Sequence, residues 1–241
     1  VMAEGPAHDL NRTANTQPAL LAHSLAVWAA LCAELTPAVA ASRLRAVAGH
    51  SVGEYAAAVI AGAVSLPDAA RVLRLRGEAM QAAADAAAPT SPMHTKPSPL
   101  GMAALLLTPP RHAAHHAEHS PIHDAVAAVA AEAALGVVAV AAVNAPAQLV
   151  LSGHTAAMEA TVARLRATHA GLVRRAIPLP VSAPFHSPIM AAAVPPLREA
   201  VEAAFARHRT TTLAHAIVVN VDATAVTEQA SLQTALVRGV T

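Results

Sequence analysis

Apolar and polar positions follow two different spacings along this chain, and these spacings predict its elements. Helical spacing or composition marks seven stretches, and six short stretches, most of them apolar, are predicted to be strands, of which 45–48 and 137–143 are expected to be buried. The predicted helices cover 17–35, 52–62, 68–87, 109–134, 154–169, 188–207 and 230–238. The predicted strands cover 45–48, 101–107, 137–143, 148–152, 172–177 and 216–219. Because helices and strands alternate, the chain is predicted to be an α/β protein.

The segment 101–178 has an element order of its own. Its strands and helices follow β-α-β-β-α-β, the ferredoxin-like arrangement, with a turn expected at 144–146. The preceding stretch, 89–100, contains four prolines and no periodicity, which predicts a loop at the junction. We therefore expect a small subdomain at 101–178, inserted into a larger α/β domain formed by 1–98 and 181–241.

The high apolar content raises the question of a membrane span. Apolar residues make up 55% of the 241 residues and charged residues only 13%, which excludes intrinsic disorder. The best candidate span, 125–143, has Glu132 at its centre and is divided by Gly136. This pattern predicts a helix followed by a buried strand instead of a membrane helix. No apolar signal segment is visible after Val1.

Charge, cysteine and histidine content narrow the function further. The formal net charge of +1 argues against a nucleic-acid-binding protein. The single cysteine, Cys32, excludes an internal disulfide and is expected to be a small buried side chain. The His-rich stretch 112–123 places His112, His115, His116 and His119 on one helical face, but no Cys or carboxylate ligand completes a metal motif. We expect a solvated helix face there and no metal.

The stretch Gly49-His50-Ser51-Val52-Gly53 carries the strongest chemical signal. It follows a predicted strand and opens a predicted helix, which is the context of a nucleophile elbow. The glycines allow a tight turn that exposes the Ser51 hydroxyl. The N–H of Val52 and the helix N-terminus can then stabilise developing negative charge. Ser51 is predicted to be a nucleophile; the alternative is a Gly-rich turn with a serine cap.

A serine nucleophile needs a general base, and two histidines are candidates. His186 lies in the Pro-punctuated loop PLPVSAPFHSP, a usual setting for a catalytic residue on a rigid scaffold. His50 is adjacent to Ser51, but its side chain must point in another direction. We therefore favour His186 as the base and a structural role for His50.

Three arginines are clustered on the predicted helix 68–87, namely Arg71, Arg74 and Arg76. A buried arginine on this Ala-rich helix would be costly without an acidic partner. An arginine near the serine could instead bind a substrate carboxylate through two parallel hydrogen bonds. The alternative for each of the three is a solvated helix face.

Seven stretches, spread nearly end to end, together resemble one protein family. They are TQPAL (16–20), AGHSVGEYAA (48–57), RGEAMQ (76–81), GMAALL (101–106), NAPAQLVLSG (144–153), PLPVSAPFH (178–186) and VVNVDA (218–223). The chain resembles the malonyl-CoA:acyl carrier protein transacylases and the related acyltransferase domains of polyketide synthases. The resemblance implies an α/β-hydrolase-like core with an inserted ferredoxin-like subdomain.

The resemblance also implies a role for each matching site residue. Ser51 would be the nucleophile and His186 its base, in a dyad whose histidine is oriented by a backbone carbonyl. Arg76 would bind the free malonyl carboxylate, and the ring of Phe185 would crowd an α-methyl branch. The remaining residues that it places at the substrate are His50, Val52 and Asn144.

The implied reaction moves a malonyl group from malonyl-CoA to the phosphopantetheine thiol of acyl carrier protein through a malonyl-serine ester. Such a reaction belongs to fatty acid synthesis in the cytoplasm. It needs no cofactor beyond the phosphopantetheine carried by the partner protein. Neither a metal nor a nucleic-acid or membrane partner is expected.

Both ends of the chain depart from the family pattern. The family begins with a strand and a Gly-Gln-Gly loop that residues 1–15 do not contain, and it continues beyond Thr241. Gly239 stands where a glutamine carbonyl would orient the histidine. These departures favour a chain truncated at both ends, and they leave two alternatives open. One is a truncated or inactive copy that acts at most as a carrier-protein-binding module. The other is a serine esterase or thioesterase, which only the elbow supports.

Overall fold

The structure, a computed structural model, describes residues 2–35, 39, 42–87, 99–109, 120–181, 183–208 and 210–241. Contacts divide the chain into two compact units. The first contains Val1–Ala79 and Ala193–Gly239, and the second contains Met80–Ala192 and Val240–Thr241. This division falls at other positions than the predicted domain bounds of 1–98, 101–178 and 181–241, which stay a prediction.

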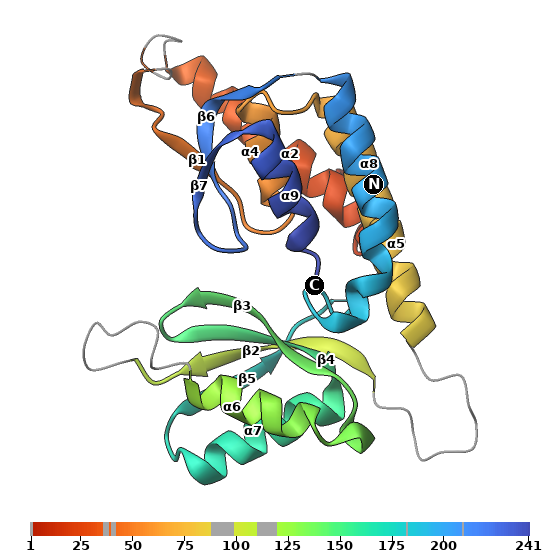
Figure 1. Cartoon of the computed structure of the whole chain (residues 1–241), viewed down its shortest axis with the longest axis vertical. Helices are drawn as coiled ribbons and strands as arrows, with labels where there is room; N and C mark the ends of the chain where they lie inside the picture. The colour runs from red at the N-terminus through yellow and green to blue at the C-terminus, as the bar shows by residue number, and fades with distance from the viewer. Residues whose placement is uncertain are drawn as a thin grey trace. The chain divides into compact units, whose positions relative to one another are not determined.

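The first unit combines helices with a three-stranded sheet. Its strands are β1 (Ala46–Ala48), β6 (Thr212–Val218) and β7 (Ala225–Glu228), in the order β1-β6-β7. β1 runs parallel to β6, and β6 runs antiparallel to β7. Helix α4 packs on β1 and β6, while α9 packs on β6 and β7 (Figure 1). The helices are α1 (Ala7–Leu10), α2 (Thr13–Glu34), α4 (Gly53–Ile60), α5 (Leu66–Ala87), α8 (Val194–Arg207) and α9 (Gln229–Arg238), with the end of α5 assigned to the second unit.

All three strands of this sheet differ from the sequence expectation; β6, predicted at 216–219, begins at Thr212. The strand predicted at 45–48 is present as β1, but Ala46 and Ala48 are exposed, so the prediction of a buried strand is wrong. The reason is that β1 pairs only with β6 in the part of the chain that the structure describes, which leaves its other edge open. Strand β7 was not predicted, because its four residues are mostly exposed and form no apolar run.

Helix α2 is longer and less buried than the sequence indicates. It begins at Thr13, four residues before the predicted start, and Cys32 on it is half-buried and not part of the core. Among the described helices it is the one long and apolar enough to cross a membrane by length and hydropathy. However, Gln17 and Leu21 are buried, and α2 packs on α4. The buried side chains and the packing on α4 are typical of a helix that packs within a folded domain.

The second unit contains a four-stranded antiparallel sheet. Its strands lie in the order β3-β4-β2-β5, and α6 and α7 cover one face (Figure 1). Leu105, Leu149, Leu151 and Leu165 are fully buried between the sheet and these helices. In chain order the elements are β2 (Leu100–Leu107), α6 (Ser120–Ala130), β3 (Val138–Ala145), β4 (Gln148–His154), α7 (Thr155–Thr168) and β5 (Val173–Pro178). This is the β-α-β-β-α-β order predicted from the sequence.

Local differences in the second unit concern the segments on either side of β3. The helix predicted at 109–134 is α6, which ends at Ala130 and is followed by a short 3-10 helix, Ala133–Leu135. The stretch 125–143 is therefore divided between helices and strand β3, as expected. Asn144 lies in β3 where the pairing register shifts, so the turn predicted at 144–146 instead occupies 146–147.

The structure describes only the end of the His-rich stretch 112–123, from residue 120 onward. His112, His115, His116 and His119 lie outside the described residues, whereas His123 is exposed on α6. Within the described ranges, no group of three or more His, Cys, Asp or Glu side chains is arranged to hold a metal ion.

Candidate active site

Ser51 occupies a tight turn between β1 and α4, residues 49–53, which we call the serine turn. Its φ of 51° is a left-handed backbone conformation that residues other than glycine rarely adopt. The His50 carbonyl accepts a hydrogen bond from the N–H of Gly53 at 2.9 Å, and the Ser51 carbonyl accepts one from Glu54 at 3.0 Å. These bonds start α4 directly after the serine. The strand, turn and helix expected around Ser51 are therefore all present.

The two glycines of the turn have different steric environments. A Cβ on Gly49 would lie 2.0 Å from the carbonyl carbon and oxygen of Gly53, so no side chain fits there. A Cβ on Gly53 would meet nothing within 4 Å. The close approach of Gly49 to the first residue of α4 is thus what makes the turn tight.

Asn220, two residues after the end of β6, binds this turn through its side chain. Its Oδ1 accepts a hydrogen bond from the Ser51 N–H at 2.5 Å, and its Nδ2 donates to the Gly49 carbonyl at 2.6 Å. The backbone N–H of Asn220 donates to Oε1 of Glu54 at 2.8 Å. A residue 169 positions away in the sequence therefore contacts the backbone on both sides of His50.

Arg76 is the arginine of α5 that the fold directs toward Ser51. Its side chain is buried, with only 4% of the residue exposed. Nη2 lies 3.3 Å from the Oγ of Ser51, and Nη1 donates to Oε1 of Gln17 at 2.8 Å. Arg71 and Arg74 are exposed; Arg71 pairs with the buried Asp68 at 3.0 Å, and Arg74 pairs with the exposed Glu78 at 2.6 Å. The structure thus separates one buried arginine from two solvated ones.

A close helix crossing brings Gln17 to Arg76. A Cβ on Gly77 of α5 would lie 2.6 Å from the Cα of Ala14 on α2, so this crossing requires glycine. Gln17, one turn further along α2, is buried and donates through Nε2 to Oγ1 of Thr13 at 3.0 Å. This bond fixes the amide so that its oxygen faces the guanidinium.

Burial dominates the electrostatics around Arg76. It lowers the pKa of the Arg76 guanidinium, and the nearby Tyr55 and Glu54 oppose that shift. Burial also raises the pKa of Glu54, against the opposing effects of the Asn220 N–H and of Arg76. The pKa of Tyr55 rises to about 12 for the same reason. The structure describes no carboxylate within ion-pair distance of Arg76, and its Nε has no partner among the described residues.

Phe185 and His186 lie in the second unit, in the loop between β5 and the 3-10 helix Pro188–Ala193. Both are half-buried, and His186 has a φ of 55°. The buried hydroxyl of Ser187 donates to the Pro184 carbonyl at 2.7 Å and holds this turn. His186 therefore has a well-defined local backbone, while its pairing with Ser51 stays a prediction.

The other predicted residues are placed as follows. His50 is exposed beside Ser51, and Val52 is the residue from which α4 starts. Asn144 is exposed on β3 of the second unit. Gly239 ends α9 in the first unit, where a Cβ would lie 3.8 Å from Oε2 of Glu54. The structure thus brings together Ser51, Val52 and Arg76 within the first unit.

Sequence reasoning missed three residues that contact this site, namely Gln17, Glu54 and Asn220. Each lies in a stretch that carried the family resemblance: TQPAL, AGHSVGEYAA and VVNVDA. Membership in those stretches was the only available signal, because the partners of Gln17 and Asn220 are far away in the sequence.

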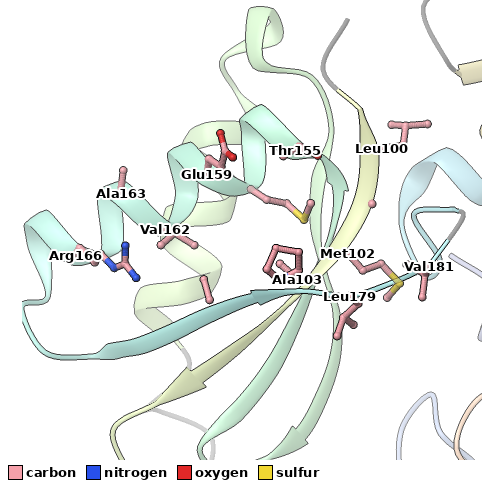
Figure 2. Close-up of a pocket in the computed structure, with 14 residues that line it drawn as sticks. Leu100, Met102, Ala103, Thr155, Glu159, Val162, Ala163, Arg166, Leu179 and Val181 are labelled. Atoms are coloured by element: carbon pink, nitrogen blue, oxygen red, sulfur yellow. The ribbon is translucent and has the colours of Figure 1, made fainter.

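A separate cavity of about 460 Å³ lies in the second unit, lined by α7, β2, β5 and the segment after β5 (Figure 2). Met102, Val162, Leu179 and Val181 contribute apolar surface, and Arg166 lies on α7 at its border. None of the predicted site residues lines this cavity.

Comparisons with known proteins point to one family. Residues 1–93 match the model of the acyl transferase domain. The chain is 36% identical over 237 residues to the malonyl CoA-acyl carrier protein transacylase of Salmonella typhimurium, covering 98% of this chain and 65% of the relative. For the enzyme of that name from Bacillus subtilis, identity is 33% over 235 residues, with 97% and 63% covered. The chain thus spans 65% or less of the length of these two relatives.

Two solved structures that are similar to this chain are also malonyl-transferring enzymes. The acyl-carrier-protein-S-malonyltransferase of Bartonella henselae superposes with a TM-score of 0.77 at 33% identity, covering 98% of this chain and 65% of that one. A malonyl-transacylase solved in complex with a type II polyketide synthase acyl carrier protein superposes with a TM-score of 0.76 at 29% identity, with the same coverage.

Proposed function

We propose that this chain belongs to the acyltransferase family that contains the malonyl-CoA:acyl carrier protein transacylases, and that it carries out the reaction of that family. It transfers a malonyl group from malonyl-CoA to the phosphopantetheine thiol of an acyl carrier protein, in fatty acid synthesis. The observation that carries this proposal is the buried guanidinium of Arg76 beside the Ser51 hydroxyl.

A malonyl thioester matches this arrangement because it has an anion and an electrophile close together. Its free carboxylate is two bonds from the thioester carbonyl carbon, and Arg76 is one hydrogen-bond length from Ser51. A buried cation without a carboxylate partner is costly, so an anionic substrate that supplies one binds favourably. An acetyl group lacks the carboxylate and would leave the Arg76 guanidinium without an anionic partner.

In the first half-reaction His186 accepts the Ser51 proton while Oγ attacks the thioester carbonyl carbon. The N–H of Val52, at the start of α4, stabilises the oxyanion of the tetrahedral intermediate. The C–S bond then breaks, His186 returns the proton to the departing thiolate, and CoA leaves a malonyl-Ser51 ester. In the second half-reaction His186 accepts the proton of the carrier thiol, whose sulfur attacks the ester. The Ser51 oxygen leaves and regains a proton from His186.

The same proposal assigns the fold and the remaining residues. The parallel β1–β6 pair followed by the serine turn supports an α/β-hydrolase-like core, and the strand order β3-β4-β2-β5 supports a ferredoxin-like second unit. Phe185 would crowd an α-methyl branch and so favour malonyl over methylmalonyl groups, a difference of about 1–3 kcal/mol for one methyl group. His50 and Asn144 complete the set of substrate-site residues carried over from the family. The proposed location is the cytoplasm.

Intact-mass measurement after incubation with malonyl-CoA tests this function. We expect one malonyl adduct on the chain and none on a Ser51→Ala variant of equal folded content. Addition of acyl carrier protein should then remove the adduct and malonylate the carrier. A folded sample without any adduct would contradict the proposal. Rapid release of free malonate without transfer to the carrier would instead indicate a thioesterase.

A further inference from the structure

The loop after β6 contacts the serine turn through the side chain of Asn220. Within this loop the Val219 N–H donates to the Thr224 carbonyl at 2.9 Å, and Asp222 accepts hydrogen bonds from the N–H and hydroxyl of Thr224. These bonds hold the loop without help from the serine turn. The Asn220 side chain is exposed and directs both of its polar atoms at Gly49 and Ser51.

The Asn220 amide extends the pairing of β1 with β6. The last backbone pair of that ladder is Ala48 with Val218. Beyond it, β1 turns sharply at Gly49, and the backbone of β6 can no longer follow. The side-chain amide of Asn220 presents one acceptor and one donor, as a peptide group does, and bonds the Ser51 N–H and the Gly49 carbonyl.

A second anchor connects Asn220 to the helix on the other side of the serine. Glu54 lies in the first turn of α4, is buried, and accepts the Asn220 backbone N–H at 2.8 Å. The serine turn is therefore tied to β6 before Ser51 and, through Glu54, after it. A sparsely populated backbone conformation such as that of Ser51 persists only where its surroundings over-determine it.

We propose that Asn220 is a positioning residue that holds Ser51 in its reactive backbone conformation through bonds to Gly49 and Ser51. This inference rests on the proposed function, in which Ser51 is the nucleophile. Asn220 touches neither the substrate carboxylate nor Arg76 in this assignment. Its loss should therefore slow acylation and leave the affinity for malonyl-CoA nearly unchanged.

The first test compares Asn220→Ala with Asp222→Ala, which alters the same loop without removing a bond to the serine turn. Acylation of Ser51 is followed with malonyl-CoA and, separately, with a fluorophosphonate, whose phosphorus the Ser51 oxygen attacks as fluoride leaves. We expect Asn220→Ala to lower both rates about 10–100-fold, since small misplacements of a reacting group have effects of this size. KM for malonyl-CoA should change less than about threefold. Asp222→Ala keeps the Val219–Thr224 backbone bond and the bonds of Asn220 to Gly49, Ser51 and Glu54, so its rates should stay within about threefold of the parent rates.

Asn220→Asp provides a signature that general destabilisation would not give. The aspartate keeps the acceptor for the Ser51 N–H, but when ionised it lacks the donor for the Gly49 carbonyl. Protonation restores that donor. The ratio of variant to parent acylation rates should therefore rise as the pH falls. Parent-like rates in Asn220→Ala, an effect on KM alone, or a pH-independent ratio in Asn220→Asp would overturn the proposal.

Hydrogen exchange of the peptide covering 49–54 tests the geometry without any reaction. Asn220→Ala should speed exchange in this peptide and leave peptides of α5 unchanged; unchanged exchange at 49–54 overturns the proposal. The proposed malonyl transfer and the positioning role of Asn220 are contradicted by different results. A parent protein that reacts with the fluorophosphonate but not with malonyl-CoA contradicts the proposed function, while the comparison of the variants with that probe still decides the role of Asn220.

Discussion

The Nη2 of Arg76 lies 3.3 Å from the Oγ of Ser51, although 25 residues separate them in the sequence. The serine turn presents one of these groups and the middle of α5 presents the other. Gln17 accepts a hydrogen bond from the same guanidinium at 2.8 Å and so limits its rotation. A cation is thereby fixed next to a hydroxyl in a site where neither position depends on a flexible surface side chain.

Replacing Arg76 should change which acyl groups the protein accepts. Arg76→Ala removes the partner of the malonyl carboxylate, and we expect kcat/KM for malonyl-CoA to fall at least about 100-fold, given the strength of charge-assisted hydrogen bonds. Acetyl transfer, which uses no such contact, should fall much less. Arg74→Ala on the exposed face of the same helix is the control. Equal losses for both acyl groups would show that Arg76 does not bind the carboxylate.

A carboxylate at position 17 should compete with the substrate for Arg76. In Gln17→Glu the new side chain can pair with the guanidinium that Gln17 contacts at 2.8 Å. We expect KM for malonyl-CoA to rise about tenfold or more, and thermal stability to be kept or increased, because the buried cation gains a partner. Steady-state kinetics and thermal melting check both effects. A stable variant with unchanged KM would contradict the role given to Gln17.

The crossing of α2 and α5 should not tolerate a methyl group at position 77. In Gly77→Ala the Cβ would lie 2.6 Å from the Cα of Ala14, and relief requires the helices to separate. We expect a loss of about 1–3 kcal/mol in the free energy of unfolding, as for other overpacked sites. Gly53→Ala, whose Cβ meets nothing within 4 Å, should be neutral or gain up to about 1 kcal/mol. Urea denaturation of both variants measures the two free energies of unfolding. Equal stability of Gly77→Ala and the parent would contradict the close crossing.

Asp68 should stabilise the fold in a pH-dependent way. Its carboxylate accepts hydrogen bonds from Ser65, Arg207 and Arg71 at 2.7, 2.9 and 3.0 Å, and these contacts hold its pKa below the ordinary value of 3.8. Because the folded pKa is the lower one, the unfolded chain binds the proton more readily. The stabilisation is therefore complete above pH 3.8 and is lost as the pH falls through the folded pKa.

The corresponding variant, Asp68→Asn, should unfold more easily than the parent at neutral pH, and the difference should shrink in acid. Thermal melting of the variant and the parent, from neutral pH to below pH 3.8, measures this difference in stability. Asp85→Asn is the control, since Asp85 is exposed on the same helix and the structure describes no ion pair for it. A difference between Asp68→Asn and the parent that does not depend on pH would exclude an electrostatic origin.

Most helices and strands followed from the sequence because their signals are local. The apolar spacing of 68–87 and the run at 101–107 appear in the structure as α5 and β2 with shifts of one or two residues. The serine turn was also predictable, since Gly49 and Gly53 flank Ser51 within five residues. Asn144 was misplaced because a shift of pairing register in β3, which depends on β4, moved the turn by two residues.

The sequence by itself determined that the chain forms an α/β protein with a serine turn before a helix, and it named Arg76 as one of three candidate arginines. Only the tertiary structure decided which arginine is buried and what surrounds it. Gly77 lets α2 approach α5, so that Gln17 reaches Arg76, and the pairing of β6 with β1 carries Asn220 to Ser51. These contacts join residues 59 and 169 positions apart, and local spacing holds no information about which distant segments will pack together.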